Sequence, residues 1–126
     1  MFKQLNQILI EWDKCAEAFA VAVEDAATKN VEWERFAAKT RIELRADAAA
    51  VGQKLTNDDL AAHVLEADID GLRLDAAIAE AVVAGLRKRL DVFQAQADAA
   101  RSEIASERAR EQAWAVSPSV PHGGAR

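Results

Sequence analysis

The chain has 126 residues, 29 of them alanine, and a formal net charge of −5. This length suits one domain, and no apolar run approaches the ~18 residues that a membrane span requires. The sequence contains no glycine-rich phosphate loop, no set of zinc ligands and no nucleophile with an assignable base, so we expect neither enzymatic activity nor a cofactor. The single cysteine, Cys15, and the lack of a signal-peptide pattern indicate the cytoplasm.

Residues that break helices are rare until the C-terminal end. The first proline is Pro118, and only three glycines precede it. Because alanine, leucine, glutamate, arginine, lysine and glutamine all favour helix, the sequence predicts an all-α fold. Residues 117–126 contain two prolines and two glycines, which predicts a disordered C-terminal tail.

The first predicted helix extends from about residue 2 to residue 50, because apolar residues recur there at every third or fourth position. Its apolar positions are Leu5, Leu9, Trp12, Ala16, Phe19, Val23, Ala26, Trp33, Ala37 and Leu44. Asn30 is a polar residue on this face. Either it caps a separate helix, or it is a register-setting polar residue inside one continuous helix. We favour the continuous helix, and Gly52 is expected to end it in the left-handed conformation.

The second predicted helix begins after a turn at residues 51–56. Thr56 is placed to cap its first turn, and Asp59, three residues later, completes a capping box. Leu55 can pack on Leu60 across this start. The beginning of this helix is therefore the clearest boundary in the sequence.

This second helix is expected to continue to about residue 115. The sequence leaves open whether residues 68–71 interrupt it. We favour continuity, because a glycine such as Gly71 costs only about 1 kcal/mol inside a helix. Two long helices joined by a short turn predict that residues 1–116 form a single antiparallel helical hairpin of the coiled-coil type.

Two apolar stripes follow the second predicted helix. The first has strict heptad spacing and comprises Ile69, Leu72, Ala76, Ala79, Val83, Leu86, Leu90, Phe93, Ala97, Ala100 and Ile104. The second lies beside it and comprises Leu74, Ile78 and Val82. One partner helix can cover only one stripe, so we expect hairpins to pack into a bundle as a homo-oligomer. The predicted oligomer interface is Leu74, Ile78, Val82, Val83, Leu86, Leu90 and Phe93.

Beyond Ile104 the first stripe turns polar at Glu107 and Glu111, and Trp114 follows. Large aromatic side chains often anchor protein interfaces. Trp114 is therefore a candidate anchor for a partner protein, and the alternative is that it packs near Phe2 of the first helix.

Basic residues in the second helix suggest a different function, direct binding of nucleic acid. The candidate contacts are Arg87, Lys88, Arg89, Arg101, Arg108 and Arg110. Acidic residues are interleaved with them, and an ion pair between Asp98 and Arg101 is expected from their spacing. We therefore favour a solvated, ion-paired helix face over a phosphate-binding stripe.

Glu66, Asp68 and Asp70 precede Gly71 in the way that acidic ligands open a calcium-binding loop. The twelfth position of such a loop would be Ala77, which cannot supply the required carboxylate. We expect no metal site here.

Four segments carry a resemblance: Ile42–Ala48, Gly52–Ala61, Gly71–Ala81 and Arg101–Arg110. Together they resemble small helical proteins of tailed bacteriophages, which are often encoded near replication and recombination functions. The resemblance implies only a setting, a phage-encoded protein in the host cytoplasm or the virion, and no functional residue carries over from it. In that setting we expect the helical hairpin to act as an oligomeric adaptor that holds other proteins in a DNA-processing complex or in the virion. We expect a non-enzymatic interaction or assembly protein whose partners are itself and other proteins.

Overall fold

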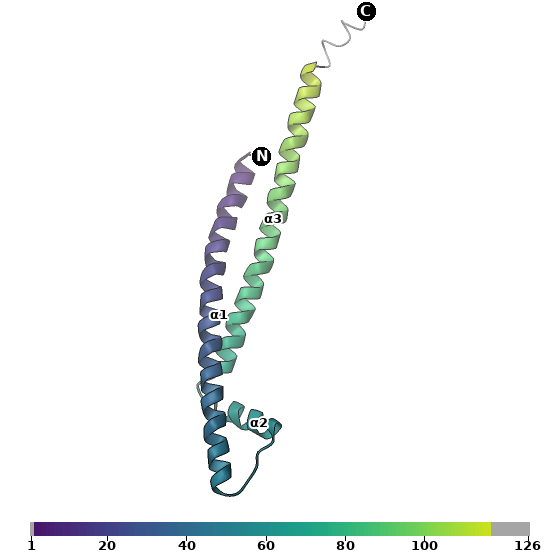
Figure 1. Ribbon diagram of the computed structural model, residues 1–126. Coiled ribbons are helices and arrows are strands. Elements are labelled where there is room, and N and C mark those ends of the chain that lie inside the picture. The colour runs from purple at the N-terminus through teal and green to yellow at the C-terminus, as the bar shows by residue number, and fades with distance from the viewer. Residues whose placement is uncertain (1, 117–126) are drawn as a thin grey trace, which may run out of the picture. The chain divides into compact units, whose positions relative to one another are not determined.

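The computed structural model describes residues 2–116, and the side chains of residues 4–115. Over this range the chain forms three helices, α1 (Phe2–Ala50), α2 (Asn57–Ala67) and α3 (Leu72–Val116), and no strand (Figure 1). The all-α prediction is confirmed. None of the described helices combines the length and apolarity needed to cross a bilayer. The predicted disordered tail, 117–126, lies outside the described residues.

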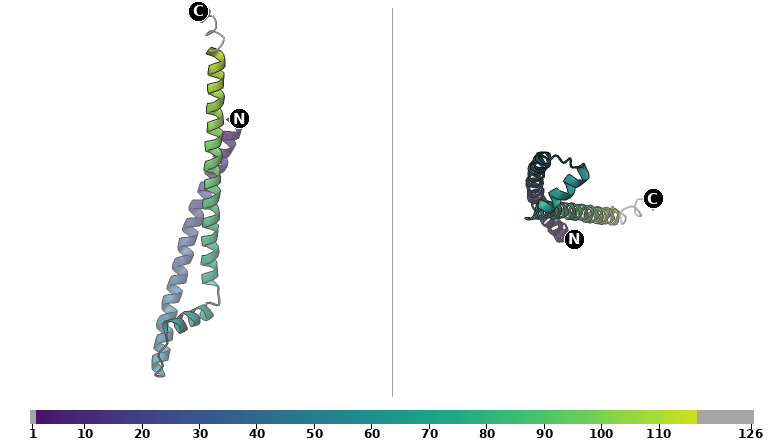
Figure 2. Two further views of the ribbon diagram at one scale, coloured as in Figure 1. Left: turned by 90° about the vertical axis from the view of Figure 1, so that its right-hand side faces the viewer. Right: turned by 90° about the horizontal axis from the view of Figure 1, so that it is seen from below.

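The chain divides into two compact units. The central unit comprises Ala18–Arg87, and the terminal unit joins Met1–Glu17 with Lys88–Arg126. All of α2 belongs to the central unit, whereas α1 and α3 each contribute residues to both. Within the central unit, α2 crosses α1 at a steep angle (Figures 1 and 2).

In the central unit, α1 and α3 make contacts in opposite order along the two helices. The guanidinium carbon of Arg87 lies 5.7 Å from the ring centroid of Phe19, and that of Arg73 lies 5.7 Å from the ring centroid of Trp33. The later residue of α1 thus contacts the earlier residue of α3.

Asn30 lies between these two contacts, and α1 is continuous through it. Its side-chain Nδ2 donates a hydrogen bond to Oε1 of Glu80 on α3 at 2.6 Å. The continuous helix is confirmed, and the alternative that Asn30 caps a separate helix is wrong. This hydrogen bond between α1 and α3 favours the observed alignment of the two helices, because other alignments would place the Asn30 amide against apolar side chains.

The end of α1 is a Schellman motif. Gly52 has a φ of 76°, as expected for the residue that ends the helix. The N–H of Gln53 donates to the carbonyl of Ala48 at 2.8 Å, and the N–H of Gly52 donates to that of Ala49 at 3.1 Å. Carbonyls that the last turn would leave unpaired are therefore satisfied by the backbone itself.

The start of α2 has the predicted capping box. The N–H of Asp59 donates to Oγ1 of Thr56 at 3.1 Å, and the N–H of Thr56 donates to Oδ2 of Asp59 at 3.4 Å. Leu60 is 2 % exposed, and Leu55 is half-buried. A threonine and an aspartate three residues apart thus fix the first residue of α2.

We expect Thr56→Ala to lower the free energy of unfolding by about 1 kcal/mol, since it removes the hydroxyl that caps α2. Urea unfolding followed by circular dichroism measures this loss. Thr56→Ser keeps the hydroxyl and is the control. Superimposable unfolding curves for Thr56→Ala and the wild type would contradict a stabilising role for this cap.

The predicted continuous helix from 57 to 115 is wrong, because the chain leaves helical geometry between α2 and α3. Asp68 accepts hydrogen bonds from the first two N–H groups of α3: Oδ1 from Leu72 at 2.8 Å and Oδ2 from Arg73 at 3.0 Å. Gly71 has a φ of 73°, which a residue with a Cβ seldom adopts. A carboxylate that satisfies free helical N–H groups, next to a glycine that permits the bend, stabilises a new helix start over a continuation.

Most of the first apolar stripe of α3 is covered, as predicted. Its buried members are Ala76, Ala79, Val83, Ala97, Ala100 and Ile104, and its half-buried members are Leu72, Leu86, Leu90 and Phe93. Ile69 is the exception: it lies in the break and is 91 % exposed.

On α1, the prediction that Ala16 and Val23 lie on the covered face is wrong. Both are exposed, and their neighbours Cys15 and Ala22 are buried and half-buried instead. A helical stripe can advance by either three or four residues per turn. At these positions both alternatives on α1 are apolar, so the sequence gives little contrast between the covered and the exposed residue.

The core consists mainly of small side chains. Seven of the twelve buried apolar residues in the described range are alanine, and Val64 is the one large side chain there that is less than 2 % exposed. One buried cluster joins Ala26 of α1 with Ala79 and Val83 of α3, and Phe19 packs against it. Because an alanine methyl contributes much less transfer free energy than a leucine side chain, this core stabilises the single chain only modestly.

Candidate interaction surface

A row of apolar side chains on α3 is uncovered in the central unit. Leu74, Ile78 and Val82, here called the flank stripe, are 63 %, 53 % and 50 % exposed. The residues next to them in sequence, Ala79 and Val83, are 5 % and 8 % exposed. This part of α3 is therefore apolar on two sides, and α1 covers one of them.

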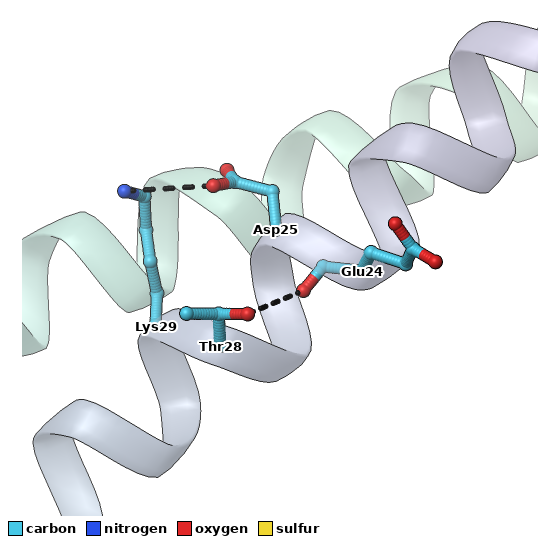
Figure 3. Close-up of polar contacts among 4 residues, drawn as sticks. All are labelled: Glu24, Asp25, Thr28 and Lys29. Atoms are coloured by element: carbon cyan, nitrogen blue, oxygen red, sulfur yellow. Dashed lines mark hydrogen bonds and ion pairs between the residues drawn. The ribbon is translucent and has the colours of Figure 1, made fainter.

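Two members of the flank stripe, Ile78 and Val82, line one wall of a groove of about 150 Å³. Its lining residues are Ala22, Asp25 and Lys29 of α1, and Asp75, Ile78, Ala79 and Val82 of α3. Nζ of Lys29 lies 3.6 Å from Oδ1 of Asp25 (Figure 3). The charged side chains on the α1 wall therefore pair with each other.

Beside this ion pair, α1 satisfies another polar side chain from its own backbone. Oγ1 of Thr28 donates a hydrogen bond to the carbonyl of Glu24 at 3.0 Å (Figure 3). These polar groups of α1 make their contacts along the same helix and so leave Ile78 and Val82 on the α3 side of the groove uncovered.

Gly85 follows Val82 by three residues and so lies on the same side of α3 as the flank stripe. A Cβ atom added at Gly85 would meet nothing within 4 Å. No contact inside the chain requires a glycine here, although glycine destabilises a helix by about 1 kcal/mol relative to alanine. A residue without a side chain does allow another backbone to approach closely.

The remaining residues of the predicted oligomer interface are less accessible. Val83 packs against Ala26 and Ala79 inside the chain. Leu86, Leu90 and Phe93 are half-buried. Within the predicted set, the flank stripe thus offers the most apolar surface to a partner.

Trp114 is 77 % exposed on the last turns of α3. It lines a surface hollow together with Arg110, Glu111 and Ala113, all from the same helix. The other predicted position, against Phe2, involves a side chain outside the described range. The exposure of Trp114 is consistent with an interface anchor in the absence of its partner.

All six basic residues proposed as nucleic-acid contacts, Arg87, Lys88, Arg89, Arg101, Arg108 and Arg110, are exposed. Arg87 and Arg101 are among those with contacts inside the chain. Arg87 lies over the ring of Phe19, and Nη1 of Arg101 lies 3.7 Å from Oδ1 of Asp98. The predicted ion pair between Asp98 and Arg101 is confirmed.

One of the acidic residues before Gly71, Asp68, has a structural role. Both carboxylate oxygens of Asp68 accept backbone hydrogen bonds from α3. Among the residues described, no three metal-ligating side chains of histidine, cysteine, aspartate or glutamate come together.

A second hollow could not be predicted from the sequence, because its walls depend on how α2 packs against the other two helices. It is lined by Trp33, Arg41, Ala61, Val64, Leu65 and Arg73, which come from all three helices. Trp33 and Arg41 are eight residues apart on α1, but Arg73 lies on α3 and Ala61, Val64 and Leu65 lie on α2, so no spacing rule connects the whole set. The break at Asp68–Gly71 brings them together by separating α2 from α3.

The chain matches no family model, and neither a curated protein nor a solved structure is significantly similar to it. The geometry of its surfaces is therefore the basis for a functional conclusion.

Proposed function

We propose that this chain is a non-enzymatic interaction protein. In this proposal α1 and α3 form an antiparallel helical hairpin that self-associates through the flank stripe and acts as a helical adaptor for other proteins. The observation that supports it is the exposure of Leu74, Ile78 and Val82 at 63 %, 53 % and 50 %, directly beside a covered stripe. Apolar side chains that are exposed as a contiguous row commonly mark an interface.

The size of the flank stripe predicts weak rather than tight association. Full burial of a valine, leucine or isoleucine contributes roughly 1.5–3 kcal/mol, so burying the exposed half of three such side chains yields about 3 kcal/mol per copy. Two copies would gain about 6 kcal/mol from the stripe, and the loss of translational and rotational freedom opposes this gain. We therefore expect a dissociation constant of tens of micromolar or above, since ~6 kcal/mol alone corresponds to about 40 μM.

The resemblance to phage proteins favours a DNA-processing complex or the virion as the setting of this adaptor. In either setting, many copies at high local concentration would make a weak self-contact sufficient. Gene neighbourhood distinguishes these two settings.

Gly85→Ala tests the proposal. Since alanine favours helix by about 1 kcal/mol, the variant should melt at a higher temperature when monomeric. Its new Cβ would obstruct a partner at the flank stripe, so self-association should weaken at least several-fold in sedimentation equilibrium. Ala84→Ser is the control, because it adds one atom at an exposed neighbour two residues from Val82. A wild-type protein that stays monomeric at about millimolar concentration would overturn the self-association.

A further inference from the structure

The hollow where all three helices meet, here called the three-helix cavity, has an apolar floor. Val64 of α2 is 1 % exposed, and Trp33 of α1 is half-buried. Leu65 is 52 % exposed at the same cavity. An apolar side chain from outside could therefore replace water against Trp33 and Leu65.

Two arginines line this cavity, Arg41 from α1 and Arg73 from α3. Neither forms an ion pair with a carboxylate among the described residues, and both are exposed. The guanidinium of Arg73 lies 5.7 Å from the Trp33 ring centroid, a distance at which cation–π attraction holds it over the ring. Guanidinium groups are suited to bind carboxylates through two parallel hydrogen bonds.

The cavity volume of about 260 Å³ indicates what kind of ligand fits. Pockets that enclose small organic ligands have volumes of about 300–1,000 Å³. A smaller open cavity suits one anchoring side chain of a protein segment. A carboxylate close to that anchor in sequence would reach the arginines at the rim.

We propose that the three-helix cavity binds an acidic amphipathic helix of a partner protein. A large apolar side chain of that helix packs against Trp33 and Val64, and a glutamate one turn away pairs with Arg41 and Arg73. This inference rests on the proposed role as an interaction protein, but it uses no residue of the flank stripe.

The acidic residues of segment 51–80, which give it a net charge of −5, oppose an acidic ligand at long range. At physiological ionic strength such repulsion is screened beyond about 8 Å. Direct contact with two guanidinium groups therefore dominates. The partner is expected to combine few, well-placed carboxylates with apolar anchors instead of a long acidic tract.

Fluorescence anisotropy with the full chain tests this site. The probe is a fluorescein-labelled peptide of about twelve residues built from alanine, leucine and glutamate, with leucine and glutamate at helical three- and four-residue spacing. We expect saturable binding to the wild type and at least tenfold weaker binding of the same peptide with glutamine for glutamate. Arg41→Gln and Arg73→Gln should each weaken binding at least tenfold. Arg45→Gln, one turn beyond Arg41 and also exposed, should leave it unchanged.

Three results would overturn the inference: equal binding of the glutamate and glutamine peptides, an equal loss in Arg45→Gln and Arg41→Gln, or no binding at about millimolar protein. Circular dichroism checks that each variant keeps its helices. Sedimentation distinguishes this site from self-association, since Arg41→Gln should associate like the wild type. Val82→Glu should still bind the peptide.

Discussion

Val82→Glu is expected to abolish self-association with little change in helix content, whereas Val83→Glu is expected to unfold the central unit. The two residues are adjacent valines in the middle of α3, and the substitution is the same. Val82 is 50 % exposed on the flank stripe, and Val83 is 8 % exposed and packs against Ala26 and Ala79. The pair thus separates the effect of surface charge from that of a buried charge.

The magnitudes of the two effects differ by several kcal/mol. A carboxylate at position 83 would lose its hydration beside the apolar groups of Ala26, Ala79 and Phe19, at a cost of several kcal/mol. Small domains have a total stability of only about 5–15 kcal/mol, so this cost removes much of it. At position 82 the carboxylate stays in water in the monomer and is buried only on association. Thermal melts and sedimentation equilibrium on both variants measure these outcomes, and a stable, oligomeric Val82→Glu would contradict the proposed interface.

Asp68→Ala is expected to destabilise the protein by about 2 kcal/mol, the upper part of the range for a lost helix cap. The variant loses hydrogen bonds at 2.8 and 3.0 Å to the N–H groups of Leu72 and Arg73. It also removes a negative charge from the positive end of the α3 dipole. Amide hydrogen exchange should therefore accelerate first at Leu72 and Arg73.

Asp68→Asn is the informative control. Its side-chain oxygen can accept one of the two bonds, while the charge and the second acceptor are lost, so an intermediate destabilisation is expected. If Asp68→Ala and the wild type showed the same exchange rates at Leu72 and Arg73, the carboxylate would have no role in starting α3.

The features that could be predicted from the sequence depend on neighbouring residues. The capping box needs only Thr56 and Asp59, and the helix end needs only the conformational freedom of Gly52. Both were found where expected. The first apolar stripe of α3 was equally predictable, since a heptad pattern specifies which face is covered.

The break at Asp68–Gly71 was not predicted because two local features of the sequence favour a continuous helix. Glycine costs only about 1 kcal/mol inside a helix, which a long helix tolerates. In addition, Ile69 keeps the heptad spacing with Leu72, so the stripe seemed unbroken. The deciding contribution is the bidentate cap of Asp68, which exists only once the chain has bent.

The two candidate surfaces also differ in whether they follow from local sequence or from the packing of distant residues. The flank stripe follows from spacing within one helix, and its exposure agrees with the expectation that one partner helix covers one stripe. The three-helix cavity requires Trp33, Arg41 and Arg73 to meet, and their meeting depends on how α2 packs. Arg73 lies more than thirty positions beyond Arg41 and on another helix, so its place beside Trp33 leaves no local signature in the sequence.

The alanine-rich core has a consequence for the response of the protein to temperature. Exposing apolar surface raises the heat capacity of the unfolded chain, and exposing polar surface lowers it. Because seven of the twelve buried apolar residues in the described range are alanine, unfolding a single chain exposes little additional apolar surface. The heat-capacity change should lie below the usual ~12–15 cal/mol/K per residue, which makes the stability curve broad and flat. Such a chain keeps nearly the same margin of stability over a wide thermal range and resists unfolding by cold.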